Sequence, residues 1–409
     1  MSIRWITDQL GTAPGSEVAD RTDLKIIDVR DLVDKGGNRA DAVRIKIEQG
    51  AAHLANGAVT VVCCDYGISR SNAVAAGILA RHEGLSLEAA VRRVQEATGE
   101  AEIKLEPLSV VRAALGGASS VPDLRSVLMT GGTGFLGTAL QRRLRNEFNV
   151  IAPGRALIDI ERGSTAMDLL ATESSAGAVV HLANPRVYTS NIALGQSLTM
   201  LRNVIDVCLS RHIPLVYLSG WEVYSGYAGD LHVDETTPMF AKGPYGETKY
   251  LAEIMIDHLR RTAGLSCAVI RSSPVYGPGS TRPKFIHTFL EKARKGEAIS
   301  THRYRNGDPG LDLLHIDDLV EAINRVVASR FTGDLNIGTG VTTSPQDVAQ
   351  MVIEATGSRS TRGSVAIDAD TPRISMNWGK AEKELGWRPS IGLKAGLGSL
   401  ISELAKGHQ

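Results

Sequence analysis

A glycine-rich turn between an apolar strand and a helix constrains this chain more than any other stretch. Residues 127–138 read Val-Leu-Met-Thr-Gly-Gly-Thr-Gly-Phe-Leu-Gly-Thr, so an apolar run leads into glycines at Gly131, Gly134 and Gly137. Glycine lets such a turn approach a bound pyrophosphate, whose charge is favoured by the free N–H groups at a helix N-terminus. A loop for nucleoside triphosphates would end in Gly-Lys-Ser/Thr, whereas Thr138 and Ala139 follow here. The stretch therefore predicts a dinucleotide site.

Strands and helices alternate after this turn. Apolar strand patterns lie near residues 148–152, 178–182, 214–219 and 267–271, and helical segments separate them. Such alternation predicts a parallel sheet covered on both faces, with ligands bound above the carboxyl ends of the strands. Beyond about residue 275 the pattern is less regular, which predicts a smaller, substrate-facing lobe.

A break in composition precedes the glycine turn. Residues 115–123 read Leu-Gly-Gly-Ala-Ser-Ser-Val-Pro-Asp, which is small, polar and rich in Gly and Pro. A chain of 409 residues is long enough for two or three domains. We predict an α/β protein with a smaller α/β domain at 1–118, a linker at 119–124, and a Rossmann domain with a doubly wound parallel sheet at 125–409.

Composition narrows the classes of function. The 45 basic and 45 acidic residues balance, so no overall charge favours nucleic acid or a membrane surface as partner. Four cysteines are too few for a disulfide framework and favour a reducing compartment. The sequence has no run of about 18 apolar residues and no metal-ligand spacing of His, Cys and carboxylates. We expect a cytoplasmic protein without a membrane span, nucleic-acid partner or metal site.

The first candidate site follows an apolar strand pattern at residues 58–63. It reads Cys64-Asp-Tyr-Gly-Ile-Ser-Arg70-Ser71 and continues into a helical segment. Backbone N–H groups between Cys64 and Arg70 can surround an anion, and the same field lowers the pKa of the Cys64 thiol. Arg70 can bind two phosphate oxygens at once, as a lysine cannot. The pattern indicates a thiolate nucleophile that attacks a phosphate ester.

Such a reaction also needs an acid, because the leaving oxygen must receive a proton. We choose Asp31, in the loop after the strand pattern at residues 25–29, ahead of Asp28 and Asp34. Two other interpretations stay open: Cys64 as a buried structural thiol, and a redox pair formed with the adjacent Cys63.

Residues 22–115 resemble the dual-specificity branch of the cysteine phosphatases, and Val62-Cys-Cys-Asp-Tyr-Gly-Ile-Ser-Arg-Ser71 carries the match. The resemblance implies a phosphocysteine intermediate at Cys64, phosphate binding by Arg70, assistance from Ser71 and protonation by Asp31. The chain departs from the family at Cys63, where a histidine usually precedes the nucleophile.

The second candidate site is Tyr245-Gly-Glu-Thr-Lys249. Residues four apart lie on one face of a helix, so the cationic Lys249 should favour the phenolate of Tyr245. Tyr245 would then exchange a proton with a substrate hydroxyl near neutral pH. Lys249 can also bind a ribose hydroxyl.

Residues 125 to about 400 resemble the extended short-chain dehydrogenases, the NAD-dependent epimerase/dehydratase family. The matching segments are Thr130-Gly-Gly-Thr-Gly-Phe-Leu-Gly137, Val180-His-Leu-Ala183, Leu218-Ser-Gly-Trp-Glu-Val-Tyr224, Tyr245 to Lys249, Val269-Ile-Arg-Ser-Ser-Pro-Val-Tyr-Gly-Pro278, Leu314-His-Ile-Asp-Asp318, Leu335-Asn-Ile-Gly338 and Glu384-Leu-Gly-Trp-Arg-Pro389. The resemblance implies a Rossmann fold, a bound nicotinamide dinucleotide, hydride transfer beside Tyr245, and a possible homodimer.

The resemblance also places the site residues. Cofactor contacts are expected at Gly131, Thr133, Gly134, Phe135, Leu136, Gly137, Arg155, Asp159, Leu182, Ala183, Tyr245 and Lys249, and catalytic roles at Tyr245, Lys249 and Ser219. Gly220 stands where the family has its catalytic Ser or Thr, so Ser219 is the expected substitute. Glu222 is open between an acid or base role, as in dehydratases, and a surface role. Leu311 replaces an arginine that binds the diphosphate in relatives acting on nucleotide sugars, and Arg303, Arg305 and Arg373 are the candidates to compensate.

The choice of cofactor depends on the end of the second strand. Residues 149–155 read Asn-Val-Ile-Ala-Pro-Gly-Arg, without the carboxylate that would bind a ribose 2′-hydroxyl. Arg155 would suit a 2′-phosphate, and residues 155–160 resemble the reductase branch acting on keto-deoxysugars. We therefore expect NADP in preference to NAD.

Taken together, these features predict a bifunctional protein. A C-terminal NAD(P)-dependent oxidoreductase or epimerase would act on a carbohydrate-like hydroxyl or keto metabolite, and an N-terminal phosphatase would remove phosphate from a related small metabolite. The alternatives are a nucleotide-sugar epimerase, dehydratase or reductase, and a dinucleotide-sensing regulatory protein with a phosphatase domain.

Overall fold

The computed structural model describes residues 3–116, 122–185, 187–280 and 284–406. Its contacts divide the chain into two compact units. Unit 1 comprises Met1–Ser126, Arg155–Gly177 and Thr199–Ile213, and unit 2 comprises Val127–Gly154, Ala178–Leu198 and Pro214–Gln409.

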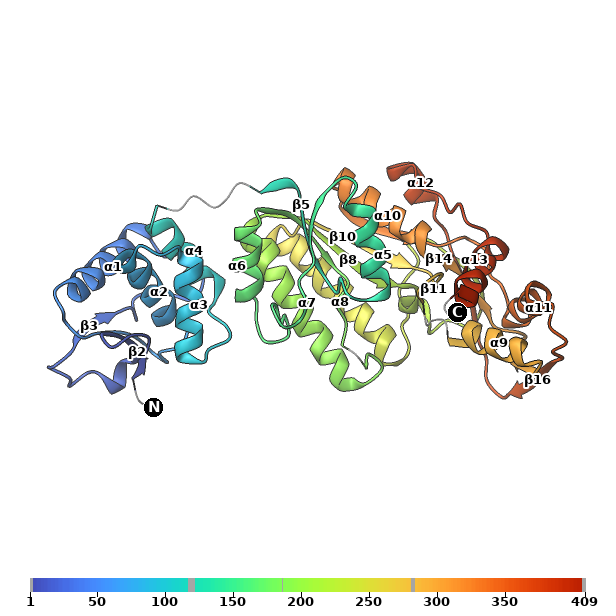
Figure 1. Cartoon of the computed structure of the whole chain (residues 1–409), viewed down its shortest axis with the longest axis horizontal. Coiled ribbons are helices and arrows are strands. Elements are labelled where there is room, and N and C mark those ends of the chain that lie inside the picture. Colours follow the sequence, from blue (N-terminus) through green and yellow to red (C-terminus); the bar gives the residue numbers. More distant parts are fainter. Residues whose placement is uncertain (1–2, 117–121, 186, 281–283, 407–409) are drawn as a thin grey trace. The chain divides into compact units, whose positions relative to one another are not determined.

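Unit 1 contains a four-stranded sheet and the first helices of the chain (Figure 1). The strands, in spatial order, are β1 (Arg4–Trp5), β2 (Leu10–Pro14), β4 (Thr60–Cys64) and β3 (Lys25–Asp28), and β4 pairs in parallel with β2 and β3. The helices are α1 (Ala40–Ala55), α2 (Arg70–Glu83), α3 (Leu87–Thr98) and α4 (Leu105–Ala114). Helices α1 and α2 approach closely because Gly50 faces Ile78 and Gly77 faces Ile47, where an added Cβ would lie within 2.7 Å of the isoleucine. This packing fixes the N-terminus of α2 just beyond the end of β4.

The main sheet of unit 2 has the strand order β6-β5-β7-β8-β10-β15. These strands are β5 (Asp123–Thr130), β6 (Asn149–Ile151), β7 (Ala176–His181), β8 (Leu215–Gly220), β10 (Cys267–Ser272) and β15 (Gly333–Ile337), and the contact division cuts through β5 and β7. The pairs β7 with β8, β8 with β10, and β10 with β15 are parallel. The strand order reverses between β5 and β7, because β6 lies on one side of β5 and β7 on the other. The predicted Rossmann-like sheet is thereby confirmed, and its ligand crevice is expected at the carboxyl ends of β5 and β7.

Helices pack on the sheet because its strands carry apolar residues on both faces. The helices of unit 2 include α5 (Phe135–Leu144), α8 (Gly243–Ala263), α10 (Ile316–Ser329) and α12 (Gly379–Leu385). On one face, Val127 and Val216 pack with side chains of α5 and α10 and with Trp387. Figure 1 shows α5 and α10 beside the sheet. Side chains alternate along a strand, so Tyr217 points to the opposite face, where its hydroxyl meets Lys249 of α8. Helix α8 therefore carries the predicted Tyr and Lys to the end of β8.

The C-terminal part of unit 2 has a second core and several short strands. Parallel strands β9 (Gly229–Val233), β17 (Pro372–Met376) and β13 (Gly310–Leu311) form one sheet, β12 (Ile299–Tyr304) pairs with β16 (Arg362–Ile367), and β11 (Val275–Tyr276) pairs with β14 (Leu314–His315). Helices α9 (Lys284–Lys295), α11 (Pro345–Thr356) and α13 (Leu393–Lys406) supply most of this core.

The contacts group the chain differently from the division predicted at residues 118 and 125. Helix α6 (Thr165–Glu173) and the second half of α7 (Asn191–Arg211) cluster with unit 1, where Thr165 exchanges hydrogen bonds with the backbone of Ile103. Residues 119–121 of the predicted linker lie outside the described residues, and Asp123 already belongs to β5. The predicted domain limits stay a prediction.

Helix α7 also bears on the expectation that the chain has no membrane span. Among the described helices, α7 alone has the length and mean hydropathy, 1.2, of a helix able to cross a membrane. Val204, Ile205 and Val207 of this helix are buried, and 39% of its apolar window is buried inside the protein.

Candidate active site

The glycine turn forms a tight cradle between β5 and α5. Gly131 has a φ of +74°, and a Cβ there would lie 2.7 Å from the backbone nitrogen of Ala183. A Cβ at Gly137 would lie 2.2 Å from the carbonyl oxygen of Gly131, so the first turn of α5 packs directly on the loop. Gly134 is the N-cap of α5 and makes no side-chain cap, which leaves this helix terminus available to an anion. The cradle fits the pyrophosphate of a dinucleotide, which residues 131–137 would hold.

Gly137→Ala is expected to abolish dinucleotide binding and to lower the free energy of unfolding by about 1–3 kcal/mol. The added methyl group would overlap backbone atoms of the cradle, which have no alternative rotamer. Calorimetric titration with NADP⁺ or NAD⁺ and denaturant unfolding measure the two effects. The control is Gly195→Ala in α7, where a Cβ meets nothing within 4 Å. An unchanged dinucleotide affinity in Gly137→Ala would contradict the cradle.

The end of β7 lies against the glycine turn. The Leu182 N–H donates to the Thr130 carbonyl oxygen over 3.2 Å, and the Thr130 hydroxyl shares a 2.6 Å hydrogen bond with Nδ1 of His181. Of the predicted cofactor residues, the structure brings together Gly131, Gly134, Gly137, Leu182 and Ala183. Phe135 and Leu136 pack partly into the core on α5, and Thr133 is exposed.

Arg155 and Asp159 belong to unit 1. The Arg155 guanidinium lies 3.5 Å from Asp159 and 2.8 Å from Glu161, and its side chain is 72% exposed. Glu161 was not among the predicted residues, because a short irregular segment has no periodicity that would place it. Arg155 is thus exposed but held between two carboxylates.

Tyr245 and Lys249 lie one turn apart near the start of α8, whose first residues, Gly243 and Pro244, set the helix N-terminus. Lys249 is buried, and its ammonium donates to the Leu218 carbonyl oxygen over 2.7 Å. The same ammonium lies 5.6 Å from the centre of the Tyr245 ring. On its other side, the Tyr245 ring contacts Tyr188, with ring centres 4.7 Å apart. Tyr188 was missed because its loop carries no recognisable pattern.

The electrostatics of this pair correct one expectation. Burial lowers the pKa of Lys249 to about 8, although Glu222 and Glu253 oppose the shift. Burial, together with repulsion by Glu222 and Tyr217, raises the pKa of Tyr245 well above its ordinary value. The prediction that Lys249 lowers the pKa of Tyr245 is therefore wrong for this state of the protein. The raised pKa keeps the proton on the Tyr245 phenol.

A carboxylate lies beside Gly220, the position where the family has its catalytic Ser or Thr. A Cβ at Gly220 would lie 2.2 Å from Oε2 of Glu222, which belongs to the 3₁₀ turn Trp221–Tyr224. Ser219 is buried and donates to Glu253 of α8, which also binds Arg271 over 2.7 and 2.9 Å. This hydrogen bond favours a structural role for Ser219, and its catalytic role stays a prediction.

Ser219→Ala is expected to lower the free energy of unfolding by about 1–2 kcal/mol while leaving turnover unchanged. The substitution removes one hydrogen bond to Glu253, but the Arg271 guanidinium still neutralises that carboxylate. Denaturant unfolding and steady-state rates measure the two properties. As a comparison, Arg271→Met leaves Glu253 buried without its cation and should cost about 3–5 kcal/mol. A large loss of turnover in a stable Ser219→Ala protein would instead support the catalytic role.

A separate cradle in unit 1 surrounds Cys64, at the junction of β4 and α2. The Gly67 N–H donates to Sγ of Cys64 over 3.2 Å, and the Ser71 hydroxyl lies 3.4 Å from it. Burial opposes the thiolate, but hydrogen bonds from Ser71 and from backbone N–H groups, including those of Ile68 and Tyr66, outweigh it and lower the pKa of Cys64. Burial and the charge of Asp28 raise the pKa of the neighbouring Cys63 to about 11. The two adjacent thiols therefore differ in acidity, and Cys64 is the one that ionises more readily.

The Arg70 side chain completes this cradle. It donates to the Leu32 carbonyl oxygen over 2.7 Å and forms an ion pair with Asp65 of its own loop. Asp34 lies 3.6 Å from Arg70, whereas Asp31 is largely exposed and binds Lys46 over 3.1 Å. The structure thus places Asp34, ranked behind Asp31 by sequence, close to Arg70, the residue predicted to bind phosphate.

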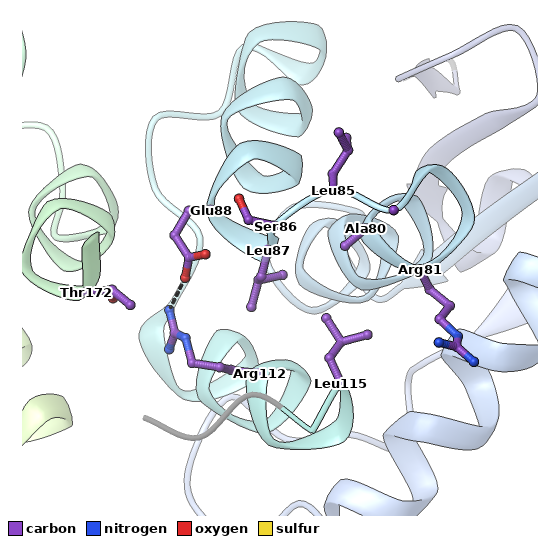
Figure 2. A pocket seen from close by; sticks show the side chains of 10 residues that line it. Ala80, Arg81, Leu85, Ser86, Leu87, Glu88, Arg112, Leu115 and Thr172 are labelled. Atoms are coloured by element: carbon purple, nitrogen blue, oxygen red, sulfur yellow. Dashed lines mark hydrogen bonds and ion pairs between the residues drawn. The ribbon is translucent and has the colours of Figure 1, made fainter. Parts of the chain in front are cut away.

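Unit 1 also has a cavity of about 440 Å³ that contains none of the predicted site residues (Figure 2). Arg112 and Glu88 face each other across it at 3.5 Å, and Leu87 and Leu115 form its apolar wall. Arg112 and Glu88 form an ion pair there, and none of the predicted site chemistry involves this cavity. Within the described ranges, no group of three or more His, Cys, Asp or Glu side chains is arranged to hold a metal ion.

Known proteins resemble this chain over the part that contains the glycine turn. The dTDP-L-rhamnose 4-epimerase of Burkholderia thailandensis is 24% identical, over 70% of this chain and 97% of its own. MoeE5 in complex with UDP-glucose and NAD is 26% identical with a TM-score of 0.58, and the match covers 69% of this chain and all of MoeE5. RMD from Pseudomonas aeruginosa, complexed with NADPH, is 19% identical with a TM-score of 0.60, over 69% of this chain and 99% of its own.

Residues 127–338 match the model of the NAD dependent epimerase/dehydratase family. This range holds the glycine cradle, the Tyr245 and Lys249 pair, and Glu222. The match extends over more than half of the chain, and relatives of the family are enzymes whose structures carry NAD or NADPH. The chain therefore belongs to the NAD dependent epimerase/dehydratase family.

Proposed function

We propose that this protein catalyses NAD(P)-dependent oxidation or reduction at a carbinol carbon of a nucleotide-linked sugar. The observation that carries the proposal is the buried Lys249 and adjacent Tyr245 in the same unit as the Gly131–Gly137 cradle. A bound nicotinamide would accept or supply the hydride, and Tyr245 would move the proton of the reacting oxygen. Relatives described as acting on dTDP-rhamnose, dTDP-glucose or UDP-glucose favour a nucleotide sugar over the broader carbohydrate-like substrate.

The nucleotide end of such a substrate needs a site in the C-terminal part of unit 2. A cavity of about 410 Å³ there is lined by one cation, Arg373, by the carboxylates Asp308 and Asp347, and by polar residues that include Asn306 and Ser344. Arg373 is bidentate to Asp230, at 2.6 and 2.9 Å. We place the nucleotide in this cavity, with Arg373 as the cation closest to its diphosphate.

Turnover with a panel of sugars tests the proposal. We expect NAD(P)-dependent conversion of at least one UDP- or dTDP-sugar, and none of the corresponding free sugar or sugar 1-phosphate. Arg373→Ala should raise KM for the nucleotide sugar by about tenfold, since it removes a charge-assisted contact. Lys394→Ala, on α13, is the control for loss of a surface cation. Equal rates with the free sugar would overturn the nucleotide-sugar assignment.

We propose a second, cysteine-dependent phosphatase activity for unit 1. Its support is the contact of Gly67 N–H and Ser71 hydroxyl with a thiol of lowered pKa, next to Arg70. The Cys64 sulfur would bond to phosphorus as the ester oxygen leaves, taking a proton from Asp34, and water would then release inorganic phosphate. Hydrolysis of p-nitrophenyl phosphate tests this function. No release of phosphate from this or any small phosphate ester would overturn it.

A further inference from the structure

We propose that Glu222 is a catalytic residue whose neutral carboxyl group donates a hydrogen bond to the reacting oxygen of the substrate, in the place of the hydroxyl that Gly220 lacks. The inference rests on the proposed redox function. It assigns to Glu222 the hydrogen-bond donation that the family's Ser or Thr at position 220 would provide.

The geometry at Gly220 carries the inference. Its φ of −159° is extended backbone that any residue can adopt, so no turn requires glycine here. A side chain is excluded only by Glu222, because the Cβ position lies 2.2 Å from Oε2 and 3.4 Å from Cδ of that residue. The carboxyl group therefore fills the volume that a serine or threonine hydroxyl at position 220 would use.

The neighbours of Glu222 show which way its carboxyl group can act. The charged or titratable side chains that face it are Lys249 and Tyr245, both from α8, and Trp221 of its own turn donates a hydrogen bond to it. Glu222 thus lies beside the two residues that are proposed to act on the substrate oxygen. By contrast, the Ser219 hydroxyl is committed to Glu253 of α8.

The carboxyl group of Glu222 gains and loses its proton near neutral pH. Burial raises the pKa of Glu222 to about 7, although the charge of Lys249 opposes the shift. The carboxyl group is therefore neutral, and a hydrogen-bond donor, below about pH 7, and it becomes acceptor-only above that pH.

The chemical step balances without an additional reactant. In the direction of reduction, the carbonyl carbon gains a hydride from the reduced nicotinamide and its oxygen gains the proton of Tyr245, which solvent later replaces. Glu222 keeps its own proton and only stabilises the charge that develops on the oxygen. In the reverse direction Tyr245 takes up the proton, and the Glu222 hydrogen bond weakens as the carbonyl forms.

A swap of the two side chains tests this role. Glu222→Ala should lower kcat by about 100-fold, the usual effect of removing one donor to a developing oxyanion. The double variant Gly220→Ser/Glu222→Ala should have a kcat at least about tenfold higher than that of Glu222→Ala, because the serine hydroxyl enters the vacated volume. The kcat of Glu222→Gln, whose amide also donates a hydrogen bond, should lie between those of Glu222→Ala and the double variant. Glu247→Ala, an exposed glutamate on α8, is the matched control. Binding of NAD(P)H verifies that each variant is folded.

A second readout does not depend on turnover. Infrared titration of the parent protein should show the C=O stretch of a protonated carboxyl group that disappears as the pH rises through about 7. The band should be missing in Glu222→Gln and unchanged in Glu247→Ala.

The outcomes separate this inference from the function on which it rests. Failure of the parent to convert any substrate overturns the redox function and this role together. If the parent converts a substrate, any of three results overturns the role of Glu222 alone. These are an unchanged rate in Glu222→Ala, no recovery of the rate in the double variant, and no titrating carboxyl band.

Discussion

Tyr245→Phe is expected to lower NAD(P)-dependent turnover by about 1,000-fold while leaving dinucleotide affinity nearly unchanged. Burial and the charges around Tyr245 hold its proton on the phenol, so this group is the acid that completes the conversion of a carbonyl oxygen to a hydroxyl. Phenylalanine preserves the ring that packs against Tyr188 but removes the proton. Steady-state rates and calorimetric binding of NAD(P)H measure the two quantities on the same protein.

Tyr250→Phe is the matched control, because Tyr250 lies on the same helix and is only half-buried. It should retain the rate of the parent. A Tyr245→Phe protein that keeps its rate would show that the proton comes from another group, and Glu222 would then be the first candidate. Loss of NAD(P)H binding in Tyr245→Phe would instead mean that the ring serves mainly to hold the cofactor.

Cys64→Ser is expected to lower phosphate release by about 1,000-fold or more, since a hydroxyl cannot replace the thiolate as nucleophile. The comparison with Cys63→Ser is informative because the two thiols are adjacent but have shifts of pKa in opposite directions. Cys63→Ser should keep its activity, because burial holds that thiol in its protonated form. Release of p-nitrophenol and of inorganic phosphate measures both variants.

Two results would contradict this assignment. Equal hydrolysis by Cys64→Ser and the parent would show that the phosphatase activity lies elsewhere. An equal loss of phosphatase activity in Cys63→Ser and Cys64→Ser would favour the redox pair, if the activity of the parent also depends on a thiol reductant. Alkylation of Cys64 at a pH below the ordinary range of a thiol would confirm its lowered pKa independently of any substrate.

The fold of unit 2 could be predicted well because its signals are local. An apolar run followed by glycines at fixed spacing specifies a strand, a turn and a helix, and the contacts of Gly131 and Gly137 show why no other residue fits. Strand β15 was not predicted from its pattern, because Gly333-Asp-Leu-Asn-Ile337 carries too few apolar residues to show a period of two. Its place at the edge of the sheet comes from pairing with β10, which lies more than 60 residues earlier.

The site was predictable in its residue types but not in its detailed geometry. Tyr245 and Lys249 follow from helical spacing, yet the raised pKa of Tyr245 depends on burial, which sequence spacing does not reveal. Ser219 is the expected substitute from its place beside Gly220, whereas its hydrogen bond to Glu253 depends on a residue more than 30 positions later in the chain. The contact between Gly220 and Glu222 depends on a short 3₁₀ turn and one side-chain rotamer. Likewise, the choice between Asp31 and Asp34 lay in a loop without periodicity.

The most direct test of the account is calorimetric titration of the purified protein with NADP⁺ and with NAD⁺. We expect one dinucleotide to bind per chain, more tightly for NADP⁺, with binding lost in Gly137→Ala and retained in Gly195→Ala. Heat from neither dinucleotide, with the protein folded, would contradict the central claim that the turn between β5 and α5 is a working cofactor site.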